Sequence, residues 1–488
     1  MNDSYCPSIR QLSRLFLVIS LLIGCFWPNV TSLAADNQPA KGQTFVIATD
    51  TTYAPFEFLD SKGKLVGIDI DILNAIAKDQ GFKVDYRFMP FSSGIQALES
   101  NQVDGMIAAM GVTPERKKSF DFTDAHYQSG AIFAVNPKAK IKNYADLKGK
   151  RVAVKIGTQG AELAEKLSKQ YHFKTVSFED SVNMYQDVTS GNSQAVIEDR
   201  PVMAYAVKTG TIDLELMGQE IDTIPLAMAV NKGQNPALRQ AFNQGLKNIK
   251  QSGQYDQIID RYVGKGAEKT QVDTSLLGQL QQNFPALLVG LGQTLLVTIC
   301  SIILALIFGV ILGLMRSSKS NWVNHIAEIY IDIMRGIPLI VLAFFIYFGI
   351  PQWTGITFGA HIAGIATLSL NAAAYIAEIV RGGIQAIAKG QFEAGRSLGL
   401  SNKVTMRKIV LPQAFKIMVP SFINQFVITL KDTSILSVIG LVELTQTGRV
   451  VIARTYQSGS MWLIVGLMYI IIITFLTKLS KHLEKELV

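Results

Sequence analysis

Four charged residues in the first half of the chain stand where strand-like segments end. Asp50, Arg116, Lys155 and Asp199 each come at or just after a short apolar, β-rich run. An arginine can clamp a carboxylate through two parallel hydrogen bonds, and an aspartate can accept hydrogen bonds from an ammonium group. Two acids and two bases at strand ends therefore suit a small zwitterion.

Three uncharged side chains could complete such a site. Thr158 follows the segment that ends at Lys155, and Tyr53 and Phe91 lie near two other strand ends, where they could sandwich an aliphatic stem. Structural roles are the alternative, since strand-end aspartates often cap helices or form turns and Arg116 lies in a charged run. Spacing alone leaves both interpretations open.

The segments around these residues alternate between strand and helix patterns. The patterns predict strands at 44–48, 84–88, 105–109 and 150–155. They predict helices at 68–81 and 161–170, and another that begins at 95–98. Such alternation argues for α/β lobes in which helices cover the sheets. Ligands of these sheets bind at the carboxyl ends of the strands, which is where the charged residues stand.

Several sequence blocks occur in an order and spacing that point to a known family. They are 48–58 (ATDTTYAPFEF), 67–71 (GIDID), 103–106 (VDGM), 113–118 (TPERKK), 120–123 (FDFT), 147–154 (LKGKRVAV) and 253–256 (GQYD). Together they resemble the periplasmic binding proteins for polar amino acids. The resemblance implies an α/β two-lobed binding-protein fold of type II at 41–265, with lobe one at 44–130 plus 225–265 and lobe two at 131–224.

The resemblance also implies roles at the α-groups of an amino-acid ligand. Arg116 would bind the α-carboxylate, with help from the hydroxyl or amide of Thr158. Asp199 would bind the α-ammonium together with the backbone near Ala109. Gly111 stands where the family usually has Ser or Thr, so one hydroxyl contact of the family is missing here.

The residues expected to contact the ligand side chain favour different substrates. By resemblance, Tyr53 and Phe91 would flank the side chain and Asp50 would reach its polar end. Asp50 and Glu198 together favour a basic side chain, whereas Lys155 favours an amide or a carboxylate. Basic amino acids and glutamine are therefore both open as substrates.

The second half of the chain has long stretches without Asp, Glu, Lys or Arg. A membrane span needs about 20 apolar residues, and the sequence predicts an all-α transmembrane domain at 284–488. The five expected helices are 285–314, 323–350, 358–384, 413–431 and 460–479. Pro338 and Pro420 are expected to break the second and the fourth.

The first residues indicate export and so fix the orientation. Arg10 and Arg14 precede the apolar run 15–27, which predicts a signal peptide at 1–35 with cleavage after Ala34. A lipobox-like stretch makes lipidation of Cys25 the alternative. The binding domain would then face the periplasm or the outside of a bacterial inner (plasma) membrane, and basic residues would fall in cytoplasmic loops of a multi-pass protein.

A motif at 390–412 resembles the EAA coupling loop of ABC importer permeases. The residues that carry it are Glu393, Ala394, Gly395, Gly399, Ile409, Leu411 and Pro412. Gly395 replaces the third residue of the family pattern. The resemblance implies a short helix at the cytoplasmic surface whose charged residues dock on an ATPase, with a glycine in a tight turn.

No phosphate-binding G-x-x-x-x-G-K-[ST] loop is present in the sequence. We therefore expect no enzyme activity and no bound cofactor, with ATP used by a separate cytoplasmic ABC ATPase dimer. Two ATPase subunits need two coupling loops and this chain has one, so we expect a homodimer through the permease domain. A linker at 266–283 would tether the binding domain to it. The absence of cysteine from 41–270 excludes a cysteine-based zinc site there.

The net charge of +8 reflects Lys and Arg beside apolar spans in contact with membrane lipid, so nucleic acid is not expected as a partner. The expected function is that of a binding and permease subunit for import of polar amino acids. An amino-acid-gated channel or a sensor built on the same binding fold is the alternative. Neither alternative accounts for the coupling loop, and no T-V-G-Y-G-like filter is present.

Overall fold

The computed structural model describes residues 40–60, 64–210, 212–263, 275–318, 320–455 and 457–487. The predicted signal peptide, with Cys25, lies outside these ranges. So does the first part of the predicted linker. Its last part is not a linker, because the first helix of the second half already begins at Leu276.

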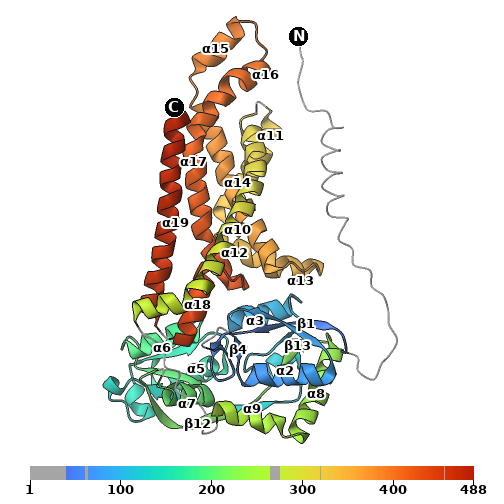
Figure 1. The fold of residues 1–488 in the computed structure, drawn as a ribbon, viewed down its shortest axis with the longest axis vertical. Helices are drawn as coiled ribbons and strands as arrows, with labels where there is room; N and C mark the ends of the chain where they lie inside the picture. Colours follow the sequence, from blue (N-terminus) through green and yellow to red (C-terminus); the bar gives the residue numbers. More distant parts are fainter. Residues whose placement is uncertain are drawn as a thin grey trace. The chain divides into compact units, whose positions relative to one another are not determined.

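The α/β region at 40–263, called the capture domain below, holds two five-stranded sheets (Figure 1). In order across the first sheet, the strands are β5 (Lys83–Phe88), β1 (Thr44–Thr49), β6 (Gly105–Met106), β13 (Ala229–Asn231) and β7 (Phe120–Phe122). In order across the second, they are β10 (Lys174–Phe178), β9 (Arg151–Lys155), β11 (Ala195–Asp199), β8 (Tyr127–Val135) and β12 (Glu215–Leu226). The chain passes between the sheets before β8 and after β12, which confirms the predicted two-lobed α/β fold.

The remaining elements of the capture domain cover or join the sheets. A small sheet consists of β2 (Thr52–Tyr53), β3 (Glu57–Leu59) and β4 (Leu65–Val66). The helices are α2 (Ile68–Gln80), α3 (Phe91–Glu99), α4 (Arg116–Ser119), α5 (Gln159–Tyr171), α6 (Ser181–Thr189), α7 (Arg200–Lys208), α8 (Pro236–Gln251) and α9 (Gln254–Val263).

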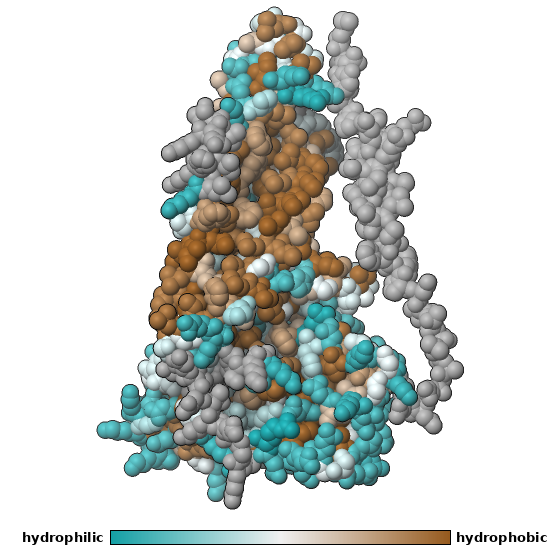
Figure 2. All heavy atoms as spheres, viewed as in Figure 1, coloured by the Kyte–Doolittle hydropathy of each residue, from teal (hydrophilic) through white to brown (hydrophobic). Residues whose placement is uncertain are grey.

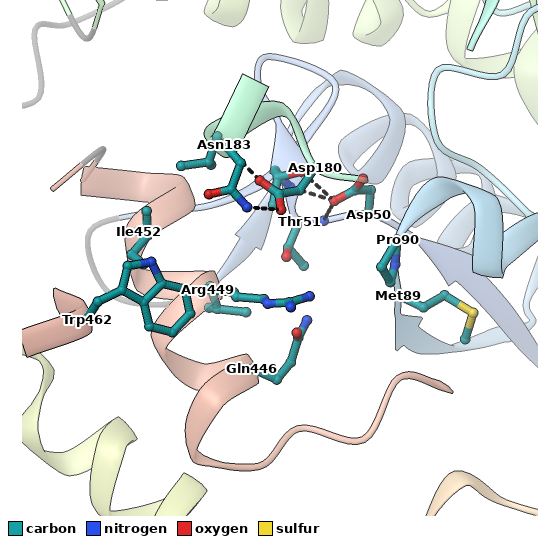
Figure 3. Close-up of a pocket in the computed structure, with 13 residues that line it drawn as sticks. Asp50, Thr51, Met89, Pro90, Asp180, Asn183, Gln446, Arg449, Ile452 and Trp462 are labelled. Carbon is teal, nitrogen blue, oxygen red and sulfur yellow. Dashed lines mark hydrogen bonds between the residues drawn. The ribbon is translucent and has the colours of Figure 1, made fainter. Parts of the chain in front are cut away.

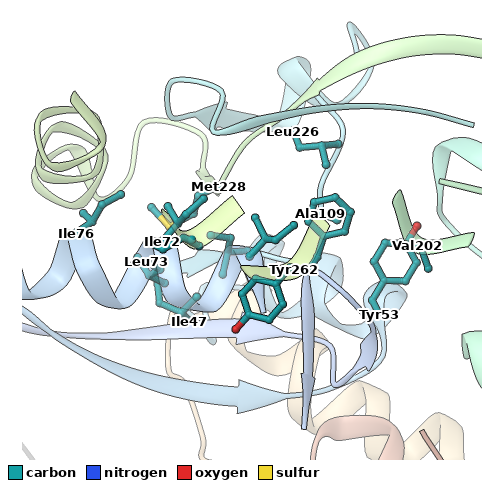
Figure 4. Close-up of a cluster of buried hydrophobic side chains, with 14 of the residues drawn as sticks. Ile47, Tyr53, Ile72, Leu73, Ile76, Ala109, Val202, Leu226, Met228 and Tyr262 are labelled. Atoms are coloured by element: carbon teal, nitrogen blue, oxygen red, sulfur yellow. The ribbon is translucent and has the colours of Figure 1, made fainter. Parts of the chain in front are cut away.

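Apolar periodicity explains how the first lobe packs. Ile72 and Leu73 lie one turn before Ile76 on the same face of α2. All three are fully buried, and Ile47 of β1 is buried in the same cluster (Figure 4). Burying such a side chain contributes roughly 1.5–3 kcal/mol. This packing holds β1 in the sheet, so that its carboxyl end delivers Asp50 to the space between the lobes.

The strand predicted at 105–109 is shorter than expected, because β6 ends at Met106. Beyond it the chain leaves the sheet, and Ala109 adopts a φ of +46°. The Ala109 amide donates a 2.7 Å hydrogen bond to Asp69 Oδ2, while Asp69 Oδ1 lies 2.8 Å from His126 Nε2. The buried pair of Asp69 and His126 thus takes the place of strand hydrogen bonds at Ala109 and holds the backbone that leads to Arg116.

The region at 275–487 is helical throughout its main elements. They are α10 (Leu276–Arg316), α11 (Asn321–Gly336), α12 (Leu339–Phe344), α13 (Ile350–Thr354), α14 (Ala360–Gln385), α15 (Lys389–Ser397), α16 (Asn402–Thr405), α17 (Leu411–Asp432), α18 (Leu444–Thr455) and α19 (Ser458–Leu487). Among the described residues, four helices are long and apolar enough to cross a membrane, or five if one bent pair counts as a span. Figure 2 shows apolar side chains gathered over these helices, in contrast to the hydrophilic capture domain.

The two prolines behave differently from each other. The predicted break at Pro338 is confirmed, since α11 and the helices after it meet at 102°. The break predicted at Pro420 is wrong, because α17 continues through it from Leu411 to Asp432. An internal proline removes only one backbone hydrogen bond of the helix. Because α17 packs between α14 and α19, its other hydrogen bonds and its contacts with these helices keep it helical.

Candidate functional site

A cavity lies between the two lobes of the capture domain, with about 360 Å³ of empty space when the part open to solvent is included. Its lining residues are Tyr53, Glu57, Phe91, Ala108, Ala109, Gly111, Arg116, Lys155, Thr158, Gln159, Asp199 and Leu226. All the predicted ligand-binding residues except Asp50 and Glu198 are in this lining. Glu57, Ala108, Gln159 and Leu226 were not predicted.

Polar contacts across the cavity join the lobes. Lys155 Nζ of the second lobe lies 2.6 Å from Asp50 Oδ2 of the first, and both side chains are buried. Arg116 of the first lobe donates from Nη2 to the Gly157 carbonyl of the second at 2.7 Å. The lobes are therefore closed over the cavity.

One end of the cavity favours an anion. Arg116 is buried there, and its Nη1 donates a 2.8 Å hydrogen bond to the Gly111 carbonyl. The N-terminus of α5 begins beside it, where the Thr158 hydroxyl accepts from the Ala161 amide as a helix cap. Helix N-termini carry partial positive charge, so a guanidinium and a helix end together suit a carboxylate. The Thr158 hydroxyl caps α5 rather than pointing freely at a ligand.

Two neighbouring carboxyl groups are also buried at the cavity wall, of which Asp199 lines the cavity and Glu198 does not. The Tyr53 hydroxyl lies 2.5 Å from Glu198 Oε1 and 2.8 Å from Asp199 Oδ2. Burial, followed by the charge of Glu198, raises the pKa of Asp199 to about 7, and burial also raises the pKa of Glu198. A single hydroxyl proton cannot serve both oxygens, so a proton shared by this pair fits the geometry. An ammonium group could replace that proton.

Glu198 faces the protein rather than the cavity. Besides the Tyr53 contact, its Oε2 accepts from the Tyr185 hydroxyl at 3.2 Å, and its Oε1 accepts from the Asp199 amide at 3.0 Å. Glu198 and Asp50 are therefore not placed to contact a ligand directly, although their charges lie close to Asp199 and Glu57 in the cavity wall. Neither residue lines the cavity, because each is already paired within the protein.

The residue that the strand-end argument missed is Glu57. Its side chain is 1% exposed, and among the described residues neither of its carboxyl oxygens has a hydrogen-bond partner. Burial and the nearby Asp69 and Asp50 raise its pKa well above the usual range, against the opposing effect of Lys155. Glu57 is the first residue of β3, and only the turn between β2 and β3 brings it to the cavity wall.

The two predicted aromatic residues lie against cations. The Arg116 guanidinium lies 5.4 Å from the centre of the Phe91 ring, and Lys155 Nζ lies 4.8 Å from the centre of the Tyr53 ring. Gly111 has a steric explanation as well, since a Cβ there would collide with Ile224 Cδ1. A Ser or Thr at this position would therefore need Ile224 to move.

The predicted coupling motif forms a compact helical turn. Glu393 and Ala394 are exposed on α15, whereas Gly395 is buried against α16, where a Cβ would come 2.7 Å from Thr405. Gly399 ends the turn with a φ of +72°, which favours glycine. Ile409 then lies in a π-helical segment at Met406–Val410. Leu411 and Pro412 are the first residues of α17.

Comparison with known proteins identifies the second half. The family model for the binding-protein-dependent transport system inner membrane component matches residues 305–488. The glutamine transport system permease protein of Escherichia coli (strain K12) is 36% identical over 204 residues, 42% of this chain and 93% of that protein. The chain belongs to this permease family. A Bacillus subtilis (strain 168) arginine transport system permease protein is 37% identical over 42% of this chain and 93% of that protein.

The permease is fused to a solute-binding domain. The family model for bacterial extracellular solute-binding proteins, family 3, matches residues 45–265. A solved ancestral arginine-binding protein bound to glutamine is 36% identical, with a TM-score of 0.43, covering 46% of this chain and 98% of that one. The two family models and the permease relative confirm the predicted fusion of a solute-binding domain with a permease.

Proposed function

We propose that this permease fusion captures glutamine in its interlobe cavity and imports it with energy from a separate ATPase. Arg116 and the α5 N-terminus would take the α-carboxylate, and Asp199 the α-ammonium. The observation that carries the choice of glutamine is the polar pair at the remaining cavity wall. Lys155 offers a donor there and Glu57 offers unpaired acceptor oxygens.

A side-chain amide matches this wall better than a charged group does. The amide oxygen accepts from Lys155 and the amide nitrogen donates to Glu57. A basic side chain would meet the buried Lys155 ammonium, and a glutamate side chain would meet Glu57 and its acidic neighbours. The name of the Escherichia coli relative favours glutamine as well, whereas that of the Bacillus subtilis relative makes arginine the second candidate.

Titration of the full-length protein in nanodiscs with Gln, Arg, Lys, His and Glu tests this choice. We expect glutamine to bind most tightly. Tighter binding of arginine would mean that Glu57 and Asp50 outweigh Lys155. No binding of any of the five amino acids would contradict the assignment of the cavity and leave only the permease assignment standing.

Replacing Lys155 with methionine is expected to weaken glutamine binding at least tenfold. A hydrogen bond from a charged donor contributes about 1.5–3 kcal/mol, and tenfold corresponds to about 1.4 kcal/mol. Asp50 keeps its hydrogen bonds from the Thr51 and Thr52 amides, so its loop should hold its shape. The exposed Lys150→Met is the matched control, and equal affinities of both variants would contradict the role of Lys155.

Glutamine affinity is also expected to fall as the pH drops below about 7, because Asp199 has a pKa of about 7 and only its ionised form pairs with an ammonium group. Affinity should be nearly constant above that value and fall by about tenfold between pH 8 and pH 6. Calorimetric titration across this range measures the effect. A profile that Asp199→Asn leaves unchanged would show that another group titrates.

The remaining parts of the transporter follow from the coupling motif. We infer a homodimer through the permease domain, which offers two coupling loops to a cytoplasmic ATPase dimer. The ATPase would supply ATP hydrolysis, and this chain would bind no cofactor of its own. In this arrangement the capture domain faces the outside of a bacterial inner membrane and the helices contact lipid.

A further inference from the structure

A second cavity, with about 500 Å³ of empty space when the part open to solvent is included, lies where the capture domain meets the permease domain (Figure 3). We call it the junction cavity. Its residues from the capture domain are Asp50, Thr51, Thr52, Met89, Pro90, Asp180, Val182 and Asn183. Its residues from the permease domain are Gln446, Arg449, Val450, Ile452 and Trp462. The two domains also meet through a hydrogen bond from Gln102 Nε2 to the Tyr347 carbonyl at 2.6 Å.

The permease side of this cavity presents two polar groups from one helix face. Gln446 and Arg449 lie three residues apart on α18, and Figure 3 shows both extending toward the loop that carries Thr51. Gln446 is 6% exposed, yet its Oε1 has no hydrogen-bond partner among the described residues. Arg449 makes no ion pair with any side chain that the structure describes. A buried unpaired oxygen and an unpaired guanidinium facing one space indicate a polar occupant.

The capture domain supplies an acid on the facing wall. Asp180 caps α6 and holds Asn183 through two hydrogen bonds, of 2.8 Å to its amide nitrogen and 2.6 Å to its side chain. A carboxylate, an amide oxygen and a guanidinium around one space match the groups of an α-amino acid.

The ion pair of Asp50 and Lys155 separates the two cavities. Asp50 lines the junction cavity, whereas Lys155 lines the ligand cavity, and their charged atoms are 2.6 Å apart. The two residues come from different lobes, so opening of the lobes would part them. The ligand cavity would then connect to the junction cavity on the permease side.

We propose that the junction cavity is a transfer site that holds the amino acid between its release from the capture domain and its entry into the permease. Arg449 binds the α-carboxylate there, and Gln446 Oε1 and Asp180 bind the α-ammonium. The site reads only the α-groups, so it accepts different amino acids. It rests on the proposed transport function but not on the choice of glutamine.

Fluorine NMR of the full-length protein tests the site directly. Trp462 lines the junction cavity and is one of only 4 tryptophans in the chain, so its 5-fluorotryptophan signal can be assigned with Trp462→Phe. The test uses an Arg116→Ala background, in which capture is disabled. We expect millimolar alanine and millimolar glutamine each to shift the Trp462 signal, and Arg449→Met to abolish the shift. An unmoved signal, or a shift that survives Arg449→Met, would overturn the proposal.

Transport measurements separate this site from the capture site. With the partner ATPase in proteoliposomes, Arg449→Met is expected to lower the maximal uptake rate at least tenfold and to leave the affinity of capture within twofold. Lys431→Met, which removes an exposed cation from α17, is the matched control and should transport normally. Normal uptake by Arg449→Met, or an equal loss of capture affinity, would contradict a transfer role. If wild-type protein captures no glutamine but the Trp462 signal still shifts, only the proposed substrate fails.

Discussion

Replacing Arg116 with alanine is expected to lower the glutamine affinity of the full-length protein at least a hundredfold. Arg116 is buried in the part of the cavity that suits a carboxylate, and it links the lobes through the Gly157 carbonyl. Truncating one partner of a buried, hydrogen-bonded charge pair costs about 2–5 kcal/mol, and a hundredfold corresponds to about 2.7 kcal/mol. Calorimetry in nanodiscs at pH 8 measures the affinity while Asp199 is largely ionised.

The matched control for this experiment is Lys117→Ala. Lys117 is the next residue of the same short helix and is exposed, so its loss should change affinity less than twofold. Arg116→Lys separates charge from geometry, because lysine keeps the charge but not the planar fork of donors. Affinity retained by Arg116→Ala would mean that the α-carboxylate binds elsewhere.

The second large effect is expected at the coupling turn. Replacing Gly395 with valine should reduce ATP-driven uptake more than tenfold and leave capture of the amino acid unchanged. A Cβ at Gly395 would come 2.7 Å from Thr405, which is 2% exposed and has little room to move. The substitution therefore pushes α15 away from α16 and displaces the exposed Glu393 from the position that an ATPase would contact.

Gly390→Val is the control, because Gly390 lies on the same helix and a Cβ there meets nothing within 4 Å. Both variants place the same β-branched side chain on α15, and only the one at Gly395 meets Thr405, so a difference between them reports mainly that contact. Uptake and ATPase stimulation are measured in proteoliposomes that contain the partner. Equal transport by the two variants would show that the close packing of α15 on α16 is dispensable for coupling.

The spacing of apolar and charged residues in the sequence predicted the architecture and most of the residues that line the ligand cavity. The alternation of strands and helices predicted two α/β lobes, and charge-free stretches predicted the helical half. Lys155 and Asp199 were found because they end the parallel strands β9 and β11, which bring such ends to one edge. Arg116 lies well beyond the end of β6 and begins α4, so its place in the cavity does not come from a strand end. The coupling glycines were found from spacing, and the structure adds the reasons: Gly395 meets Thr405 and Gly399 adopts a positive φ.

Contacts between residues distant in sequence determined the features that the sequence pattern could not predict. The sequence by itself determined which elements form and which charged residues reach the cleft, because those depend on neighbours within a few positions. Only the folded chain shows that Glu198 pairs with Tyr53, 145 residues away, and so turns from the ligand, or that Glu57 reaches the cavity unpaired. Pro420 likewise stays helical because α17 is packed between other helices. These outcomes depend on partners distant in sequence, whose positions are set only when the lobes and helices pack together.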